Sequence, residues 1–153
     1  MGKNNTLHKS MAASRFLWST GQNEKIVLAC FLQNIGLSIS KNIEKHDKIG
    51  SKFLKQMGFS PEIYEPIGLH VQAKRYLYTV DPMFSQKMSM ESKMFFNSTQ
   101  KIMSENEVRK FILSPYANIS QVIRHAYDLE YTQDSFQFDF CNILYNYLID
   151  ETK

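Results

Sequence analysis

Residues 60–82 read SPEIYEPIGLHVQAKRYLYTVDP and contain the clearest helix start in the sequence. Ser60 suits the N-cap, where a side-chain oxygen satisfies a free backbone amide, and Pro61 suits the first helical position because its φ is already helical. Apolar residues then recur at helical spacing until an Asp-Pro pair stops the pattern. The segment predicts one long helix over 63–80, which Pro66 kinks or restarts.

Segments on both sides of this helix carry the same periodicity. Residues 24–35 are apolar almost throughout and are predicted to form the buried central helix. Further helices are predicted over 7–19, 46–58 and 91–97, after a capping box at Ser104, over 118–131 and over 135–150. In the last of these, the alternation of Phe136, Phe138 and Phe140 leaves a strand as the alternative. The sequence therefore predicts an all-α bundle of about six to eight helices.

The composition is that of an ordinary domain. With 153 residues and 43% hydrophobic content the chain can bury a core, and we predict a single domain over 1–153. The formal charge of +3 is spread along the chain, and the aromatic residues occupy helical core positions, so no nucleic-acid partner is expected. The absence of a long apolar stretch predicts no membrane association and a cytoplasmic location. Cys30 and Cys141 lie in apolar patterns and are predicted to be buried, reduced thiols.

The predicted helix over 63–80 places His70 and Lys74 one turn apart on the same face. An imidazole and an ammonium in this arrangement can meet one ligand. On spacing alone, however, such a pair is more often solvated or hydrogen-bonded than ligand-binding. The residues around the pair are therefore more informative than the pair itself.

The string reads His70-Val71-Gln72-Ala73-Lys74-Arg75-Tyr76-Leu77 and is followed by Asp81-Pro82. His46-Asp47-Lys48-Ile49-Gly50 precedes it by 24 positions, and 88–92 and 127–129 follow it. These motifs together resemble the PhnZ-like branch of the HD-domain superfamily, which includes phosphonate-cleaving di-iron oxygenases and relatives of myo-inositol oxygenase. The resemblance covers residues 7–131 and implies the helical HD-domain fold.

In that family a histidine on the first helix, a His-Asp dipeptide, two further histidines and a late aspartate bind two irons. The resemblance implies that His46 and His70 are the two further histidines and that Asp128 is the late aspartate. Two histidines and one carboxylate suit a single Fe(II) ion, so the predicted cofactor is none or one iron ion. Asp47 beside His46 does not make this the superfamily's own pair, because an aspartate in a first helical turn is explained by the helix dipole.

The His-Asp dipeptide itself falls on Gln33-Asn34. An asparagine amide is neutral and a far poorer ligand for a transition metal than a bridging carboxylate, so two adjacent metals are not expected. The first-helix histidine falls on His8 if one residue is inserted before Gly21, and on Lys9 otherwise. The two assignments stay open at this point.

The resemblance also implies an anion-binding set. In the related oxygenases, the lysine one turn after the last of these histidines and a serine in the next turn hold the phosphonate, which implies Lys74 and Ser92 here. Arg124 is a further candidate contact. The alternative is that Lys74 is a surface lysine and that Ser92 caps a helix.

Three functions are consistent with these residues, and no catalytic residue is identified. The first is a degenerate family member that has lost di-metal catalysis and keeps a pocket for a small phosphate- or phosphonate-like anion. The second is an active mononuclear oxygenase or phosphohydrolase. The third is a structural partner of an intact relative, which leaves homo- or hetero-oligomers open. In all three the site is expected where the predicted helices 24–35, 46–58, 63–80 and 118–131 converge.

Overall fold

The computed structural model describes residues 3–99, 101–129 and 145–149. These residues form helices and turns without a strand, which confirms the predicted all-α fold. The elements are α1 Lys3–Ser19, α2 Glu24–Leu32, α3 Ile35–Ile39, the 3-10 turn η1 Ile43–Lys45, α4 His46–Gln56, α5 Pro61–Val80, α6 Pro82–Lys87, α7 Met90–Thr99, α8 Glu105–Ile112 and α9 Ala117–Asp128. Residues 145–149 are also helical. None of the described helices has the length and apolarity needed to cross a membrane.

The long helix predicted from the opening stretch is α5. Pro66 is buried inside it, and the helix continues through this residue. The Asp81 side chain accepts a hydrogen bond from the Met83 amide at 2.9 Å, and Pro82 takes the first position of α6. The sequence prediction lacks α6 because the Asp-Pro pair that stops α5 also starts the next helix.

The predicted helix over 24–35 is wrong at its C-terminal end. α2 ends at Leu32, and a turn at Gln33-Asn34 separates it from α3. The sequence pattern does not show this break because apolar residues continue on both sides of it. The turn places the two amide side chains at the junction between two helices.

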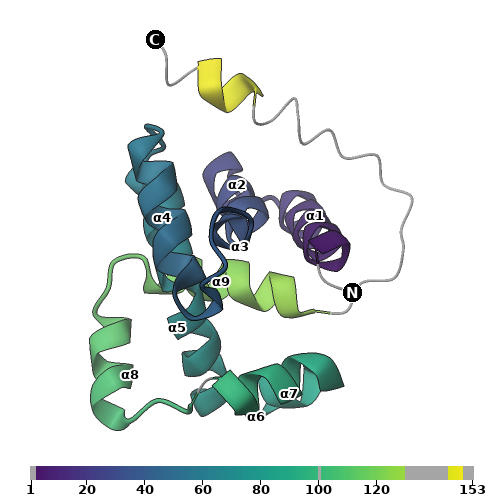
Figure 1. The fold of residues 1–153 in the computed structure, drawn as a ribbon, viewed down its shortest axis with the longest axis vertical. Helices are drawn as coiled ribbons and strands as arrows, with labels where there is room; N and C mark the ends of the chain where they lie inside the picture. The colour runs from purple at the N-terminus through teal and green to yellow at the C-terminus, as the bar shows by residue number, and fades with distance from the viewer. Residues whose placement is uncertain (1–2, 100, 130–144, 150–153) are drawn as a thin grey trace.

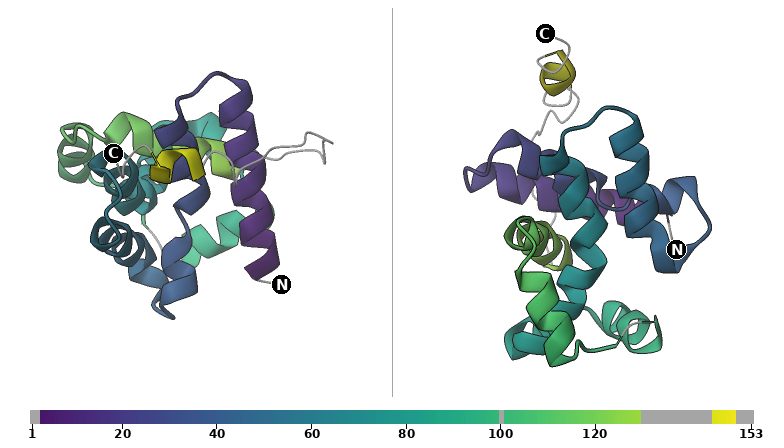
Figure 2. Two further views of the ribbon diagram at one scale, coloured as in Figure 1. Left: turned by 90° about the horizontal axis from the view of Figure 1, so that it is seen from above. Right: turned by 90° about the vertical axis from the view of Figure 1, so that its left-hand side faces the viewer.

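α5 is the helix against which most of the others pack (Figure 1). It contacts α2, α4 and α9 directly, and α2 contacts α9 as well. These four helices correspond to the segments that were predicted to converge around the site. α1 packs on α2 and α9, while α6, α7 and α8 lie toward the opposite end of the molecule from α2 (Figures 1 and 2).

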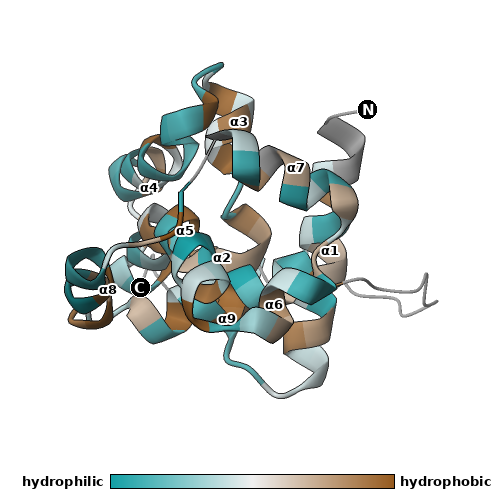
Figure 3. Ribbon diagram, turned by 90° about the horizontal axis from the view of Figure 1, so that it is seen from below, coloured by the Kyte–Doolittle hydropathy of each residue, from teal (hydrophilic) through white to brown (hydrophobic). Residues whose placement is uncertain are grey.

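The main core surrounds α2. Val27, Leu28, Ala29 and Cys30 are all 0% exposed, which confirms α2 as the buried central helix and Cys30 as a buried thiol. Figure 3 shows apolar segments of α2, α5 and α9 gathered in the interior of the molecule. Cys141 lies outside the described residues.

Glycines allow α4 to approach its neighbours closely. A Cβ atom on Gly36 of α3 would lie 1.8 Å from the backbone oxygen of His46, and one on Gly50 would lie 3.1 Å from the Gly36 nitrogen. On the other side of α4, a Cβ on Gly68 of α5 would lie 3.0 Å from the Ser51 Oγ. The start of α4 is therefore held against both α3 and α5.

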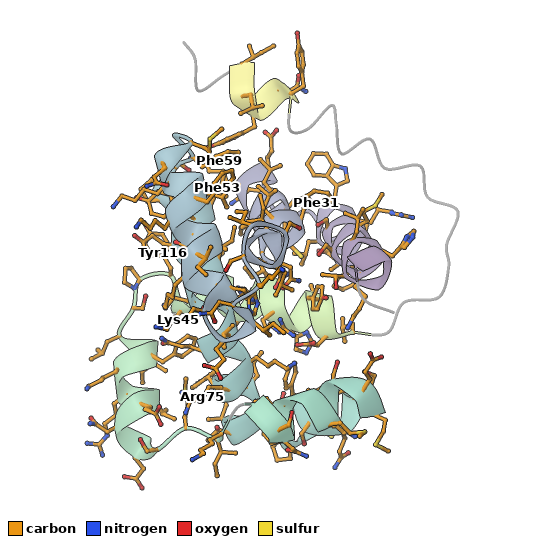
Figure 4. All side chains as sticks on the ribbon, in the orientation of Figure 1. Phe31, Lys45, Phe53, Phe59, Arg75 and Tyr116 are labelled. Atoms are coloured by element: carbon orange, nitrogen blue, oxygen red, sulfur yellow. The ribbon has the colours of Figure 1, made fainter. Side chains whose placement is uncertain are left out.

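Arg75, which belongs to the string that defined the family resemblance, has a structural role. Its Nη1 lies 2.9 Å from Glu107 Oε1, and its Nε donates to the Lys101 carbonyl at 2.7 Å. The side chain thus ties α5 to α8 and to the turn before α8, at the end of the molecule where it is labelled in Figure 4. Although Arg75 follows Lys74 directly in the chain, its side chain is thus committed to α8 and the turn before it.

The described part of the C-terminal segment packs back on the α4–α5 turn. Tyr147 is 5% exposed, and its ring stacks on Phe59 with centroids 5.7 Å apart. The Tyr147 hydroxyl accepts the Ser60 amide at 3.1 Å, which satisfies a free amide at the start of α5. Of the predicted helix over 135–150, residues 145–149 are helical, and the remainder lies outside the described residues.

Candidate functional site

Two imidazoles meet where α4 and α5 cross. His46 is the first residue of α4, and His70 lies in the middle of α5. Their Nε2 atoms are 3.0 Å apart, and their ring planes are inclined by 64°. The side chains are buried, with relative exposures of 7% for His46 and 0% for His70. The structure therefore brings together the two histidines that the sequence singled out.

Backbone carbonyls fix the tautomer of both rings. His46 Nδ1 lies 2.6 Å from the Ile43 oxygen, and His70 Nδ1 lies 2.7 Å from the Ile67 oxygen. Since a carbonyl oxygen only accepts hydrogen bonds, both Nδ1 atoms carry protons. In the neutral rings the two Nε2 lone pairs then face each other, which is unfavourable unless a proton or another cation is shared between them.

Protonation of either ring is disfavoured. Burial is the main cause that lowers the pKa of His46, and the charges of Arg124 and Lys74 lower it further. Burial also lowers the pKa of His70 well below its usual value, with Arg124 as the next cause. The two imidazoles are therefore neutral at neutral pH, and both Nε2 atoms remain electron-pair donors.

Asp128, the predicted third metal ligand, is held by a guanidinium. Arg124 Nε and Nη2 donate to its two carboxylate oxygens at 2.7 and 2.9 Å, and the two side chains are 8% and 2% exposed. Among the described residues, no three His, Cys, Asp or Glu side chains lie close enough together to hold a metal ion. The structure thus pairs the two histidines with each other and Asp128 with Arg124.

Lys74 is buried beside this pair. It is 4% exposed, so the alternative of a surface lysine is wrong. Burial lowers its pKa to about 7, the charges of Arg124 and Lys9 lower it as well, and Asp128 acts in the opposite direction. Lys74 therefore interacts electrostatically with two other cationic side chains and with one carboxylate.

The first helix contributes Lys9 to the site. Lys9 Nζ lies 4.6 Å from the centre of the Tyr127 ring, and the Arg124 guanidinium lies 4.9 Å from the same ring. His8 is exposed on another face of α1. Of the two residues that the sequence left open for the first helix, Lys9 therefore lies against the site, whereas His8 is exposed. The sequence did not predict that Lys9 lies against Tyr127, because only the contact of α1 with α9 brings these two side chains together.

Gln33, at the position where the resemblance would place the first residue of a His-Asp pair, links two helices. It is 0% exposed, and its Nε2 donates to the Cys30 carbonyl at 2.9 Å and to the Ile123 carbonyl of α9 at 3.3 Å. Its Oε1 atom is buried and has no hydrogen-bond partner in the described structure. A side chain that binds two carbonyls in this way helps to hold α2 against α9.

Asn34 is directed differently. It is 9% exposed, and its side chain interacts with the Tyr127 phenol, whose pKa it lowers against the larger, raising effect of burial. The Asn34 Nδ2 atom is buried and completes no hydrogen bond to a described residue. The amide donor therefore lies next to the aromatic ring on which Lys9 and Arg124 rest.

Two other predicted residues lie in first helical turns. Asp47 is buried in the first turn of α4, as predicted, and burial raises its pKa. Ser92 is partly buried in α7, and its amide donates to the Ser89 Oγ at 3.2 Å. Ser89 therefore caps α7, and the alternative that Ser92 is the cap is wrong. A role for Ser92 in anion binding stays a prediction.

Comparisons with known proteins give distant relatives. No protein-family model matches the chain. The chain is 33% identical over 114 residues to an uncharacterised protein of Acanthamoeba polyphaga mimivirus, an alignment that covers 68% of this chain and 52% of that protein. It is 29% identical over 80 residues to hydroxymethylphosphonate dioxygenase of Gimesia maris, which covers 52% of this chain and 39% of that enzyme. The chain thus spans about half of one relative and less of the other. The second similarity is partial and agrees with the resemblance inferred from the motifs.

Proposed function

We propose that this chain binds a small phosphate- or phosphonate-like anion at Lys74 and Arg124, beside the His46–His70 pair, and that it is impaired in di-metal catalysis. The observation that carries the proposal is the burial of Lys74 beside a second buried cation. Lys74 and Arg124 are 4% and 6% exposed, and each charge acts on the same pair of imidazoles. Buried charges of like sign repel each other strongly, so an anion between them is favourable.

The chemistry of the two cations suits an oxyanion. An ammonium acts as a point charge with three donors, and a guanidinium offers several donors in a fixed plane. Asp128 occupies two of the Arg124 donors and leaves its Nη1 side for another acceptor. The partial similarity to a phosphonate dioxygenase supports a phosphorus oxyanion over other anions.

The residues do not fit a dinuclear metal centre. Gln33 is committed to two carbonyls, Asn34 offers a neutral amide, and Asp128 is paired with Arg124. A second metal would find no free carboxylate among these positions, and the nearby cations would oppose it. This set of donors supports the proposed loss of di-metal catalysis.

One observation favours a second candidate, a site for a single metal ion. Both imidazoles present Nε2 lone pairs to the same point, and both are oriented by carbonyls through Nδ1, as in metal-binding histidines. Two nitrogen ligands at about 2.1 Å from one ion, at a right angle, lie roughly 3 Å apart. An oxygenase or phosphohydrolase with one iron ion would need Asp128 as its third ligand, and hence would need it to leave Arg124.

The substitution Asp128→Asn separates the two candidates. If the site binds an anion, removal of the carboxylate frees Arg124 and strengthens binding of inorganic phosphate and methylphosphonate about tenfold in calorimetric titrations. If the site binds a metal, the same substitution removes a ligand, and the iron content of protein purified with iron supplied falls. Lys74→Met should weaken phosphate binding at least tenfold, while Lys52→Met, which removes an exposed lysine of α4, should not.

Each result has a clear meaning. One iron ion per chain that is lost in His70→Ala and in Asp128→Asn would contradict the anion proposal and support the metal site. Phosphate binding that survives Lys74→Met would also contradict the proposal, since the anion would then sit elsewhere. Absence of both metal and anion binding would exclude both candidates.

A further inference from the structure

Asn34 is a buried polar residue whose side chain does not cap a helix. It stands in the N-cap position of α3, yet its side chain makes no capping hydrogen bond. Its Nδ2 atom is buried without a hydrogen-bond partner in the described structure, and the residue as a whole is only 9% exposed. The side chain interacts with the Tyr127 phenol, but no acceptor stands in hydrogen-bonding geometry to the Nδ2 atom. A buried donor whose hydrogen bond is incomplete is destabilising, so this interaction alone does not explain the amide.

The surroundings of this amide point to a ligand. The Asn34 side chain interacts with the Tyr127 phenol, and the ring of Tyr127 lies against both Lys9 and Arg124. Lys9 and Arg124 also act on the charge of Lys74. The unused donor therefore belongs to the same group of residues as the buried cations.

We infer that Asn34 is a specificity-determining residue whose Nδ2–H donates to an oxygen of the bound phosphate or phosphonate. The inference rests on the proposed function, since it assigns a further contact to the same anion. It also explains why a neutral amide suits this position. A carboxylate there would compete with the ligand for Lys74 and Arg124, whereas an amide of the same shape adds a donor and no charge.

The backbone holds Asn34 in place. Gly36, two residues later, lies so close to His46 that a Cβ atom would collide with the His46 oxygen. On the other side, the Gln33 side chain donates a hydrogen bond to the Ile123 carbonyl of α9. The turn that carries Asn34 is therefore fixed between α4 and α9, so the donor is positioned before a ligand arrives.

The test uses the full chain and inorganic phosphate, titrated by calorimetry. Asn34→Ala removes the donor and should weaken phosphate binding about tenfold, as expected for a hydrogen bond to a charged group. Asn34→Asp keeps the shape, adds a negative charge and should weaken it about 100-fold. Asn106→Asp adds the same charge in the exposed first turn of α8 and should leave binding unchanged.

A second measurement needs only the wild-type protein, so it does not require that a substituted protein folds. In 15N-labelled wild-type protein, the Asn34 side-chain amide resonance should shift on phosphate titration, whereas a structural amide would not respond. If wild-type protein binds phosphate and Lys74→Met abolishes binding, but Asn34→Ala binds as tightly as wild type, this inference is overturned and the proposed function stands. If wild-type protein binds neither phosphate nor methylphosphonate, the proposed function fails and this inference fails with it.

Discussion

Lys74 shows how one buried charge can link ligand binding to stability. Its pKa is lowered from 10.5 to about 7, first by burial and then by Arg124. Lys9 also lowers this pKa and Asp128 raises it, so these are the charges that face the ammonium. An anion bound beside Lys74 would raise the pKa again, because it favours the charged form. We therefore expect binding of sulfate, whose own charge stays constant, to weaken as the pH rises through about 7.

The same titration predicts the effect of Lys74→Met on stability. Between about pH 7 and 10.5 the unfolded chain binds a proton at this lysine that the folded chain lacks, so wild-type stability rises with pH in this window. Below it, the folded protein carries the full penalty of a buried charge. Lys74→Met should therefore raise the free energy of unfolding by on the order of 3 kcal/mol at acidic pH, with the gain fading toward alkaline pH.

Urea unfolding at about pH 6 and about pH 10 would measure this difference. The exposed Lys52→Met should change stability by less than about 0.5 kcal/mol at both values. A gain that is equal at the two pH values would show that Lys74 does not titrate in the folded state as described.

At the scale of elements, the site depends on how closely α4 approaches α3 and α5. Gly36 and Gly50 bring the backbones of α3 and α4 together, and Gly68 does the same for α4 and α5 beside Ser51. The Lys48 ammonium also donates to the Gly68 carbonyl across the second crossing. These contacts place the first residue of α4 opposite the middle of α5, which is why the two imidazoles meet.

The substitution Gly36→Ala tests this crossing. Its Cβ would lie 1.8 Å from the His46 backbone oxygen, so α3 and α4 must separate. We expect a loss of about 3 kcal/mol in the free energy of unfolding, measured with urea, together with weaker phosphate binding. Ser38→Ala, on the exposed side of the same helix, is the matched control and should be neutral. Wild-type stability in Gly36→Ala would mean that the crossing is wider than the structure shows.

At the scale of the whole molecule, the prediction of one domain over 1–153 can be tested by cooperativity. The only tryptophan, Trp18, lies on α1, whereas Tyr147 packs on the α4–α5 turn through Phe59. If the chain is one domain, a change at one place must shift unfolding at the other. Tyr147→Ala should therefore lower the midpoint seen by Trp18 fluorescence and by circular dichroism equally, with a loss of about 3 kcal/mol.

Tyr147→Phe keeps the stacked ring and removes only the hydroxyl that accepts the Ser60 amide. It should cost about 1 kcal/mol, so the two variants separate ring packing from the hydrogen bond. Different midpoints for the two probes in Tyr147→Ala would indicate that the C-terminal segment and α1 unfold independently.

Helices were predictable from the sequence where local chemistry defines them. The start of α5 at Pro61 and the capping box of α8 between Ser104 and Glu107 need only nearby residues, and both are present. The predicted side-chain cap of α5 is wrong, because Ser60 occupies the N-cap position without making a side-chain capping hydrogen bond. The local pattern failed at Gln33-Asn34, because that turn does not interrupt the apolar periodicity. It also failed to show α6, because the Asp-Pro pair that ends α5 begins the next helix at Pro82. The importance of the two histidines came from motifs and spacing, not from local structure.

The sequence by itself determined that this protein is all-helical, because each helix is encoded by periodicity and caps within a few residues. It also located His46, His70 and Lys74 as a group. Only the tertiary structure decided that Lys74 is buried, that Arg124 forms an ion pair with Asp128, and that Lys9 lies against Tyr127. The reason is physical: burial and charge pairing depend on which helices touch, and those contacts join residues that lie far apart in the chain.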